Sequence, residues 1–268
     1  MLDASLLDVW PMIVSGGFIV GFLVGMTGVG AGSLMTPFLI TQVGISPALA
    51  VGTDLLFAGL TKASAAARHH TFGNVNWPIV RWLAAGSVPG ALFMLAVLRI
   101  IDPDTEAIAR LIKQALAAAL MLSAVAIVLY PFLTRNGRDP LAEEQADVPP
   151  RRFPTMLLGL GLGMVVTLTS VGAGAIGVVV LTALYPALRT RRLVGTDIVH
   201  AIPLTLVSGL GHASMGNANL TLLGLLLIGS LPGIALGSRL TGKLPDWLLR
   251  IALSAVLLLA AYQLAQKI

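Results

Sequence analysis

Long apolar stretches recur along the whole chain, and they constrain its fold more than any other feature. Clear examples are residues 12–26, 79–98, 115–133, 220–236 and 248–265. An α-helix of ~20 apolar residues crosses the ~30 Å hydrocarbon core of a bilayer. Only 11% of the 268 residues are charged, whereas soluble domains carry ~25%. The sequence therefore predicts an all-α polytopic membrane protein in contact with lipid, and it excludes a soluble enzyme.

Composition also excludes several kinds of chemistry. The chain has no cysteine, so disulfides, iron–sulfur clusters, thiolate zinc sites and cysteine nucleophiles are ruled out. We expect no cofactor and no metal. The net charge of +5 comes largely from arginines in short loops beside apolar spans. Such arginines determine membrane topology, so we expect no nucleic-acid partner.

An internal repeat appears when the chain is compared with itself. At an offset of 143 residues, polar and Gly/Pro motifs of the first half recur in the second. These are Val51-Gly52-Thr53-Asp54 at 194–197, His69 at His212, Gly73-Asn74-x-Asn76 at 216–219, and Gly86-Ser87-x-Pro89-Gly90 at 229–233. Unrelated apolar helices would share scattered Leu and Ala residues instead. We infer that one unit has been duplicated.

Each unit has the same predicted order: a Gly-rich hairpin, broken at its middle, and then three transmembrane helices. The first repeat, 1–133, has the hairpin 12–44 and the spans 48–68, 77–99 and 108–133. The second repeat, 153–268, has the hairpin 154–187 and the spans 192–213, 219–240 and 246–266. The polar segment 134–152 is predicted to be a cytoplasmic linker.

The arginine distribution predicts that the two repeats have inverted topology. Arg68 follows the Gly-Thr-Asp helix of the first repeat, whereas Arg189, Arg191 and Arg192 precede that of the second. Basic loops stay in the cytoplasm, so the two helices run in opposite directions. Inversion needs an odd number of crossings per repeat, which a re-entrant hairpin plus three spans provides. This topology places both termini in the periplasm of a protein of the cell inner membrane.

An alternative topology treats each broken stretch as one full span. It gives eight crossings and parallel repeats, and it would place the Arg189–Arg192 segment outside.

Two glycine turns, 27–33 and 169–174, are the candidate substrate site. The helix that resumes after each turn exposes free N–H groups and the positive end of its dipole, which attract anions. Interrupted helices of inverted repeats form the usual substrate site of secondary transporters. The alternative is close helix packing, which we favour for Gly17-xxx-Gly21-xxx-Gly25. The predicted substrate-binding residues are Thr27, Gly28, Gly30, Gly32, Ser33, Thr53, Thr169, Ser170, Gly172, Gly174 and Thr196.

Four ionisable residues lie inside predicted spans, where an ion costs ~2.5–3.5 kcal/mol at the centre. They are Asp54, Lys62, Asp197 and His200. We predict coupling or gating roles for them: the aspartates, which are repeat mates, could carry protons, and Lys62 could attract the anion. The alternative is that they pair locally and cap the helix breaks.

Polar and aromatic residues at the span ends are assigned structural roles. We interpret His69 and His212 as surface residues, and Asn74, Asn76, Asn217 and Asn219 as helix caps. Trp10, Trp77, Tyr130, Tyr185 and Trp247 are interpreted as interfacial belt aromatics. Small-residue helix faces would allow a homodimer.

These motifs resemble those of the sulfite exporter TauE/SafE family. Residues 28–37, 50–54, 68–77 and 86–90 look like its first-half signature, and 159–177, 194–197 and 229–233 repeat it. The resemblance implies a secondary transporter that exports a small sulfur-containing anion, sulfite or an organosulfonate, by alternating access. The alternatives are a transporter of another small anion, such as thiosulfate or a carboxylate, and a non-transporting membrane component of a complex. Asp54, where Ser often stands, and Ser170, which replaces a turn glycine, depart from the family pattern.

Overall fold

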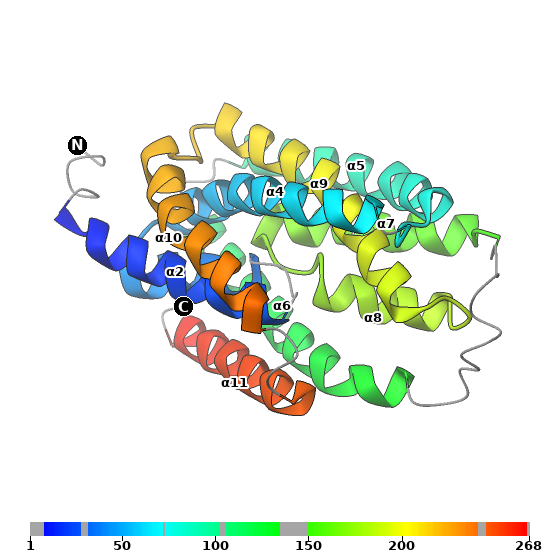
Figure 1. Ribbon diagram of the computed structural model, residues 1–268. Coiled ribbons are helices and arrows are strands. Elements are labelled where there is room, and N and C mark those ends of the chain that lie inside the picture. Colours follow the sequence, from blue (N-terminus) through cyan, green and yellow to red (C-terminus); the bar gives the residue numbers. More distant parts are fainter. Residues whose placement is uncertain are drawn as a thin grey trace.

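The computed structural model describes residues 8–27, 32–71, 73–101, 105–134, 149–240 and 245–266 (Figure 1). These ranges are helical apart from short connections, and they contain no strand. The predicted all-α class is therefore confirmed. The first half has α2 (Trp10–Thr27), α3 (Gly32–Phe38), the π-helical η1 (Leu39–Val43), α4 (Pro47–Thr71), α5 (Trp77–Ile100) and α6 (Glu106–Thr134). The second half has α7 (Arg152–Thr169), α8 (Ala175–Leu184), α9 (Thr190–Ser214), α10 (Leu220–Leu240) and α11 (Asp246–Ala265).

Six of the described helices, α5 to α7 and α9 to α11, are long and apolar enough to cross a bilayer. Large apolar side chains project outward from them, including Leu122 at 61% and Ile228 at 63% exposure. A contiguous apolar exterior of this kind needs lipid around it. The molecule is a multi-pass membrane protein. α4 has 25 residues and equals a span in length, but it carries Asp54 and Lys62 in its interior.

Each broken stretch has one long arm and one short arm. α2 and α7 have 18 residues each, and a helix of that length extends ~27 Å. α8 has 10 residues, which corresponds to ~15 Å. α8 is therefore too short to cross the hydrocarbon core. α7 is long enough to cross it, and α2 has the same length.

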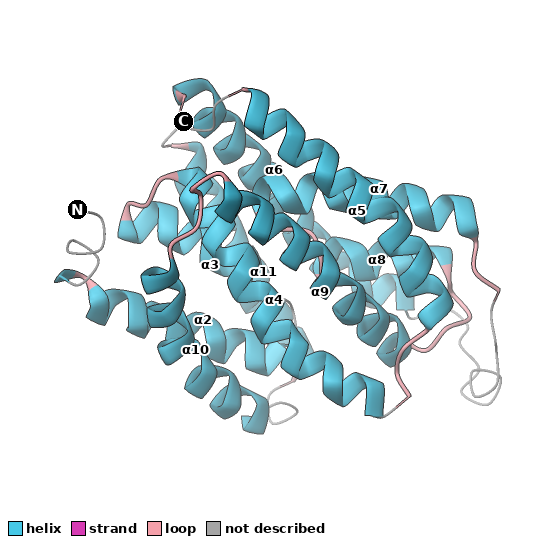
Figure 2. Cartoon of the chain, turned by 90° about the horizontal axis from the view of Figure 1, so that it is seen from above, coloured by secondary structure: helices cyan, strands magenta, loops and turns pink. Residues whose placement is uncertain are grey.

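The most extensive packing joins helices of different halves: α2 lies along α10, and α7 lies along α5 (Figure 2). Gly21 and Gly25 face the backbone of Ser230 and Ile234, so the numbering advances in the same direction along both helices. The packing interpretation of the Gly17-Gly21-Gly25 spacing is confirmed. Glycine permits this approach because a Cβ at these positions would collide with the facing backbone.

The repeated Gly-Ser-x-Pro-Gly motif has the same packing function in both halves. In α10, Gly229 and Gly233 face the backbone of α2, and in α5, Gly86 and Gly90 face the backbone of α7. The motif therefore attaches the long arm of each broken stretch to a span of the other half.

Helices at equivalent positions of the two repeats pack against each other in antiparallel pairs. α4 lies along α9, with Gly52 close to His212 and Gly59 close to Leu206. α6 lies along α11, where the Ser254 hydroxyl donates to the Ala124 carbonyl at 3.3 Å. Antiparallel equivalent helices are what inverted repeats would produce, so this packing supports the predicted inversion.

Different helix termini gather at the two ends of the molecule, so the orientation of the protein in the membrane can be tested. α2 begins and α11 ends at one end of the molecule, whereas α6 ends and α7 begins at the opposite end (Figure 1). With basic loops in the cytoplasm, single cysteines replacing Ser5 and Gln266 should react with a membrane-impermeant maleimide from the periplasm. A cysteine replacing Thr190 should react only from the cytoplasmic side. Labelling of position 190 from outside would contradict the inverted topology.

Candidate functional site

The buried polar groups of the structure gather where α4 and α9 cross between the two halves. Asp54 of α4 is fully buried. The Thr36 hydroxyl of α3 donates to Asp54 Oδ2 at 2.5 Å, whereas Oδ1 has no hydrogen-bond partner within the described ranges. The Ser170 hydroxyl lies close enough to interact with the same carboxyl. Asp54 therefore faces the short arm of its own repeat and the glycine turn of the other.

Lys62 lies two turns further along α4 and connects the halves directly. Its Nζ donates to the Ala173 carbonyl, in the second-half glycine turn, at 3.2 Å. Its ammonium interacts electrostatically with Asp197 and, more weakly, with Asp54. It is the one lysine or arginine found buried in the described part of the chain. A single buried cation thus interacts electrostatically with two buried carboxyl groups.

Asp197 of α9 repeats the arrangement of Asp54 in the other half. It is 1% exposed, and neither carboxyl oxygen has a hydrogen-bond partner among the described residues. Oδ1 faces Gly177 of α8 so closely that a Cβ there would collide with it. Each aspartate therefore lies against the short arm that follows its own glycine turn. A buried carboxyl group without hydrogen-bond partners is costly. Ionisable residues that are nevertheless buried within a membrane usually mark a functional site.

His200 lies one turn beyond Asp197 and bonds to a different helix. Its Nε2 is 2.8 Å from the Ser87 hydroxyl of α5, and Nδ1 is unpaired in the described structure. Its imidazole also interacts electrostatically with Lys62. All four predicted coupling residues thus lie in one buried region, together with Thr36, Ser87 and Ser170, which the sequence reasoning did not assign to coupling.

The second glycine turn adopts a backbone that requires its glycines. Gly172 has φ 124° and Gly174 φ 130°, and Ser170 has a left-handed φ of 60°. Side chains are strained at such angles. α8 begins directly after the turn, so the positive end of its dipole lies beside Ala173, to which Lys62 bonds. Two sources of positive potential therefore coincide at this turn.

Several predicted binding residues use their hydroxyls within the protein. Thr53 accepts from the backbone N–H of Asn219 at 3.1 Å, and Thr196 accepts from that of Asn76 at 2.9 Å. Thr169 donates to the Val165 carbonyl at 2.7 Å. These three hydroxyls stabilise helix junctions and the start of the turn. In the first turn, Gly28 and Gly30 lie outside the described residues, as do the side chains of Thr27 and Ser33. Gly32 is the first residue of α3.

The cap prediction is confirmed for two asparagines. Asn76 Oδ1 accepts from the N–H of Ile79 at 3.2 Å, and Asn219 Oδ1 accepts from that of Leu222 at 2.8 Å.

Two other interpretations are wrong. His212 is completely buried rather than at the surface, because its Nε2 bonds to the Thr167 carbonyl at 2.9 Å. Tyr185 is also buried, because its hydroxyl bonds to Thr155 and to the Arg151 backbone.

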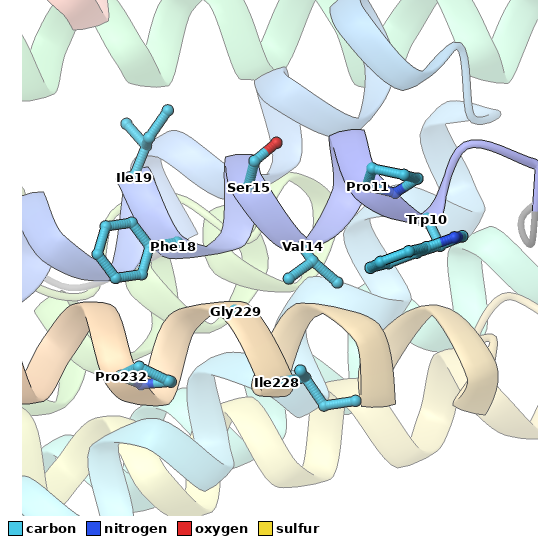
Figure 3. A pocket seen from close by; sticks show the side chains of 9 residues that line it. All are labelled: Trp10, Pro11, Val14, Ser15, Phe18, Ile19, Ile228, Gly229 and Pro232. Carbon is cyan, nitrogen blue, oxygen red and sulfur yellow. The ribbon is translucent and has the colours of Figure 1, made fainter.

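Two cavities of the described structure have apolar linings. One, of about 580 Å³, is an apolar groove between α2 and α10, lined by Trp10, Val14, Phe18, Ile228 and Pro232 among others (Figure 3). A second, of about 440 Å³, lies among α6, α7 and α8 and reaches Thr169. Both are lined almost entirely by apolar atoms of outward-facing helices. Their surroundings suit lipid chains better than an anion.

The fold and the site together define a class: a multi-pass helical membrane protein whose buried ionisable groups meet between two duplicated halves. The model of the Sulfite exporter TauE/SafE family matches residues 13–264, and the chain belongs to that family. The resemblance inferred from the motifs is thereby confirmed.

Relatives of similar length carry transporter names. The chain is 35% identical to YjnA, a probable membrane transporter protein of Bacillus subtilis (strain 168), over 94% of this chain and 98% of the relative. It is 25% identical to YdhB of the same organism, over 88% of this chain and 92% of the relative. A probable membrane transporter protein of Methanocaldococcus jannaschii is also 25% identical, over 96% and 95%. No solved structure matches the chain significantly. The protein thus belongs to a family of probable membrane transporters.

Proposed function

We propose that this protein is a secondary transporter that exports a small sulfur-containing anion, sulfite or an organosulfonate, across the cell inner membrane by alternating access of its two halves. The observation that carries this proposal is the bond from Lys62 of the first half to Ala173 in the glycine turn of the second. A buried ammonium beside a helix N-terminus provides the positive potential that an anion needs.

The anion site is proposed between the two glycine turns. On one side, Lys62, Ser170 and the turn glycines Gly172 and Gly174 would hold the substrate. Ser170 is buried and its hydroxyl lies beside the Asp54 carboxyl; it would turn toward the substrate when the anion binds. By repeat equivalence, the first turn would form the opposite wall; its residues are Thr27, Gly28, Gly30, Gly32 and Ser33. Thr53, Thr169 and Thr196 would act as the supporting frame.

Coupling to protons is proposed for the two aspartates. Asp54 lies in the eighth position of α4 and Asp197 in the eighth position of α9, and α4 and α9 run antiparallel. Asp54 is therefore nearer to one end of the molecule and Asp197 nearer to the opposite end, as a symmetric gate would require. A carboxyl that meets Lys62 in one state and water in the other would bind and release a proton as access alternates.

A competition panel tests the proposed function. Purified protein in vesicles should move radiolabelled sulfite, and unlabelled sulfonates should compete more effectively than sulfate or carboxylates. Competition by thiosulfate or a carboxylate alone would reassign the substrate. Failure to move any of these anions would favour the alternative of a non-transporting membrane component.

Asp54→Asn is expected to weaken pH-driven transport more than equilibrium anion binding. The amide keeps the shape and the hydrogen bond from Thr36 but cannot titrate. Asp197→Asn should have the same effect, more mildly because His200 can substitute as a titrating group. Flux at two pH gradients, measured beside thermal melting, checks both variants. Unchanged pH dependence in both would remove the aspartates from coupling and leave them as structural groups.

A further inference from the structure

Two short loops cross between the halves, and each bonds to the Gly-Thr-Asp helix of the other half. The α9–α10 loop donates the N–H of Asn219 to the Thr53 hydroxyl of α4 at 3.1 Å. The α4–α5 loop donates the N–H of Asn76 to the Thr196 hydroxyl of α9 at 2.9 Å. The repeat offset of 143 residues relates the two bonds to each other. The duplicated halves therefore hold each other at two equivalent points.

These two points lie toward opposite ends of the molecule, each beside a coupling aspartate. Thr53 is the seventh residue of α4, and Thr196 is the seventh residue of α9. Because α4 and α9 run antiparallel, the two loops bond at opposite ends of this helix pair. The next residue of each helix is a buried aspartate, Asp54 or Asp197. Each loop therefore lies between one end of the molecule and the nearer aspartate.

The closed α9–α10 loop buries polar groups that lack partners. The Asn217 carbonyl lies so close to Gly52 of α4 that a Cβ there would collide with it. The Asn217 side chain is buried, and its Nδ2 has no hydrogen-bond partner within the described residues. His212, also against Gly52, is buried with Nδ1 unpaired in the same part of the chain. Buried polar groups without partners destabilise the closed state, and water would bond to both of them if the loop opened.

The helix that follows the other loop is attached more firmly. α5 packs more extensively on α9 than its equivalent α10 does on α4. His200 of α9 also bonds to the Ser87 hydroxyl of α5 at 2.8 Å. At the equivalent positions of α4 and α10 stand Phe57 and Ser230, and a phenyl ring cannot form this bond. Of the two loops, the α9–α10 loop therefore has less to hold it closed.

We propose that the α9–α10 loop is a gate, which opens the anion site to one end of the molecule when the bond between Asn219 and Thr53 breaks. Both loops are closed in the described conformation. On opening, α10 moves away from α4 together with α2, against which its glycines pack, and Asp54 meets water. The α4–α5 loop stays on Thr196 and keeps the opposite end closed. This inference rests on the proposed function, because the gate controls access to the same anion site.

A cysteine replacing Ala50 reports the opening of this gate. Ala50 is completely buried and lies one turn before Asp54 on the same face of α4, and the chain has no native cysteine. In this background Thr53→Val keeps the side-chain shape but removes the hydroxyl that accepts from Asn219. Reaction of the purified full-length protein with 2-sulfonatoethyl methanethiosulfonate, a small water-soluble thiol reagent, should become about fivefold faster. That factor corresponds to the net contribution of a typical hydrogen bond, and the rate follows the open fraction.

Two matched variants show whether the effect belongs to this bond. Thr196→Val removes the equivalent bond from the α4–α5 loop, so the rate at position 50 should stay unchanged. Thr53→Ser keeps a hydroxyl and should leave the rate unchanged as well. Equal acceleration by Thr53→Val and Thr196→Val, or no acceleration by Thr53→Val, would overturn the gate.

Asn217→Leu tests the gate in the opposite direction. It removes the unpaired amide but keeps the backbone carbonyl that lies against Gly52. The closed loop should become more stable, so the rate at position 50 should fall and the melting temperature should rise. An unchanged or faster reaction would overturn the gate. These rates are measured without a transported anion, so absence of all anion flux in the wild type would overturn the proposed function separately.

Discussion

Lys62→Met should reduce anion transport by between about 10- and 150-fold, since a hydrogen bond to a charged group contributes ~1.5–3 kcal/mol. Methionine keeps much of the side-chain length but removes the ammonium that bonds to Ala173 and interacts with Asp197 and Asp54. Removing one partner from a buried charged group also costs ~3–5 kcal/mol of folding free energy. The variant is therefore expected to melt at a lower temperature as well. Vesicle flux and thermal unfolding in detergent measure the two effects.

A double variant separates the loss of the anion ligand from the loss of stability. Lys62→Met combined with Asp197→Asn removes both members of one electrostatic pair, so Asp54 is the one buried carboxyl of this group that loses its cation. Its melting temperature should return toward that of the wild type, while anion binding and transport stay low. Recovery of transport in the stabilised double variant would show that Lys62 is structural and does not bind the substrate.

The sequence was sufficient to predict the helical class and the family. Those features depend on patterns that hold along the chain: the length of apolar runs, and the recurrence of polar and Gly/Pro motifs at one offset. The positions of Asp54, Lys62, Asp197 and His200 inside spans were enough to select them as candidates, because charge is costly in lipid wherever it occurs.

The partners of these residues could not be predicted, because they depend on how the halves pack. Nothing in the sequence places Lys62 beside Ala173, 111 residues away, or His200 beside Ser87. His212 was misassigned for the same reason: a position near a helix end suggests a surface, but α7 and α4 cover this one. Thr53 and Thr196 were assigned to the substrate, although their hydroxyls already accept hydrogen bonds from backbone N–H groups of the other half, those of Asn219 and Asn76.

Gly233→Ala should destabilise the protein by about 3 kcal/mol or more, the upper range of overpacking effects. A Cβ at this position would collide with the Phe18 carbonyl of α2. That neighbour is backbone and cannot rotate away, so the two helices must separate along their contact. The change should appear as a lower melting temperature and a lower yield of folded protein.

Gly224→Ala is the matched control, because it lies on the same helix, α10, and has no neighbour within 4 Å of its Cβ position. Alanine favours a helix over glycine by up to ~1 kcal/mol, so this variant should be as stable as the wild type or more so. If Gly233→Ala leaves the stability of the protein unchanged, α2 is not held against α10. The long arm of the first broken stretch would then be free to move independently, and alternating access would not require the two halves to move as packed units.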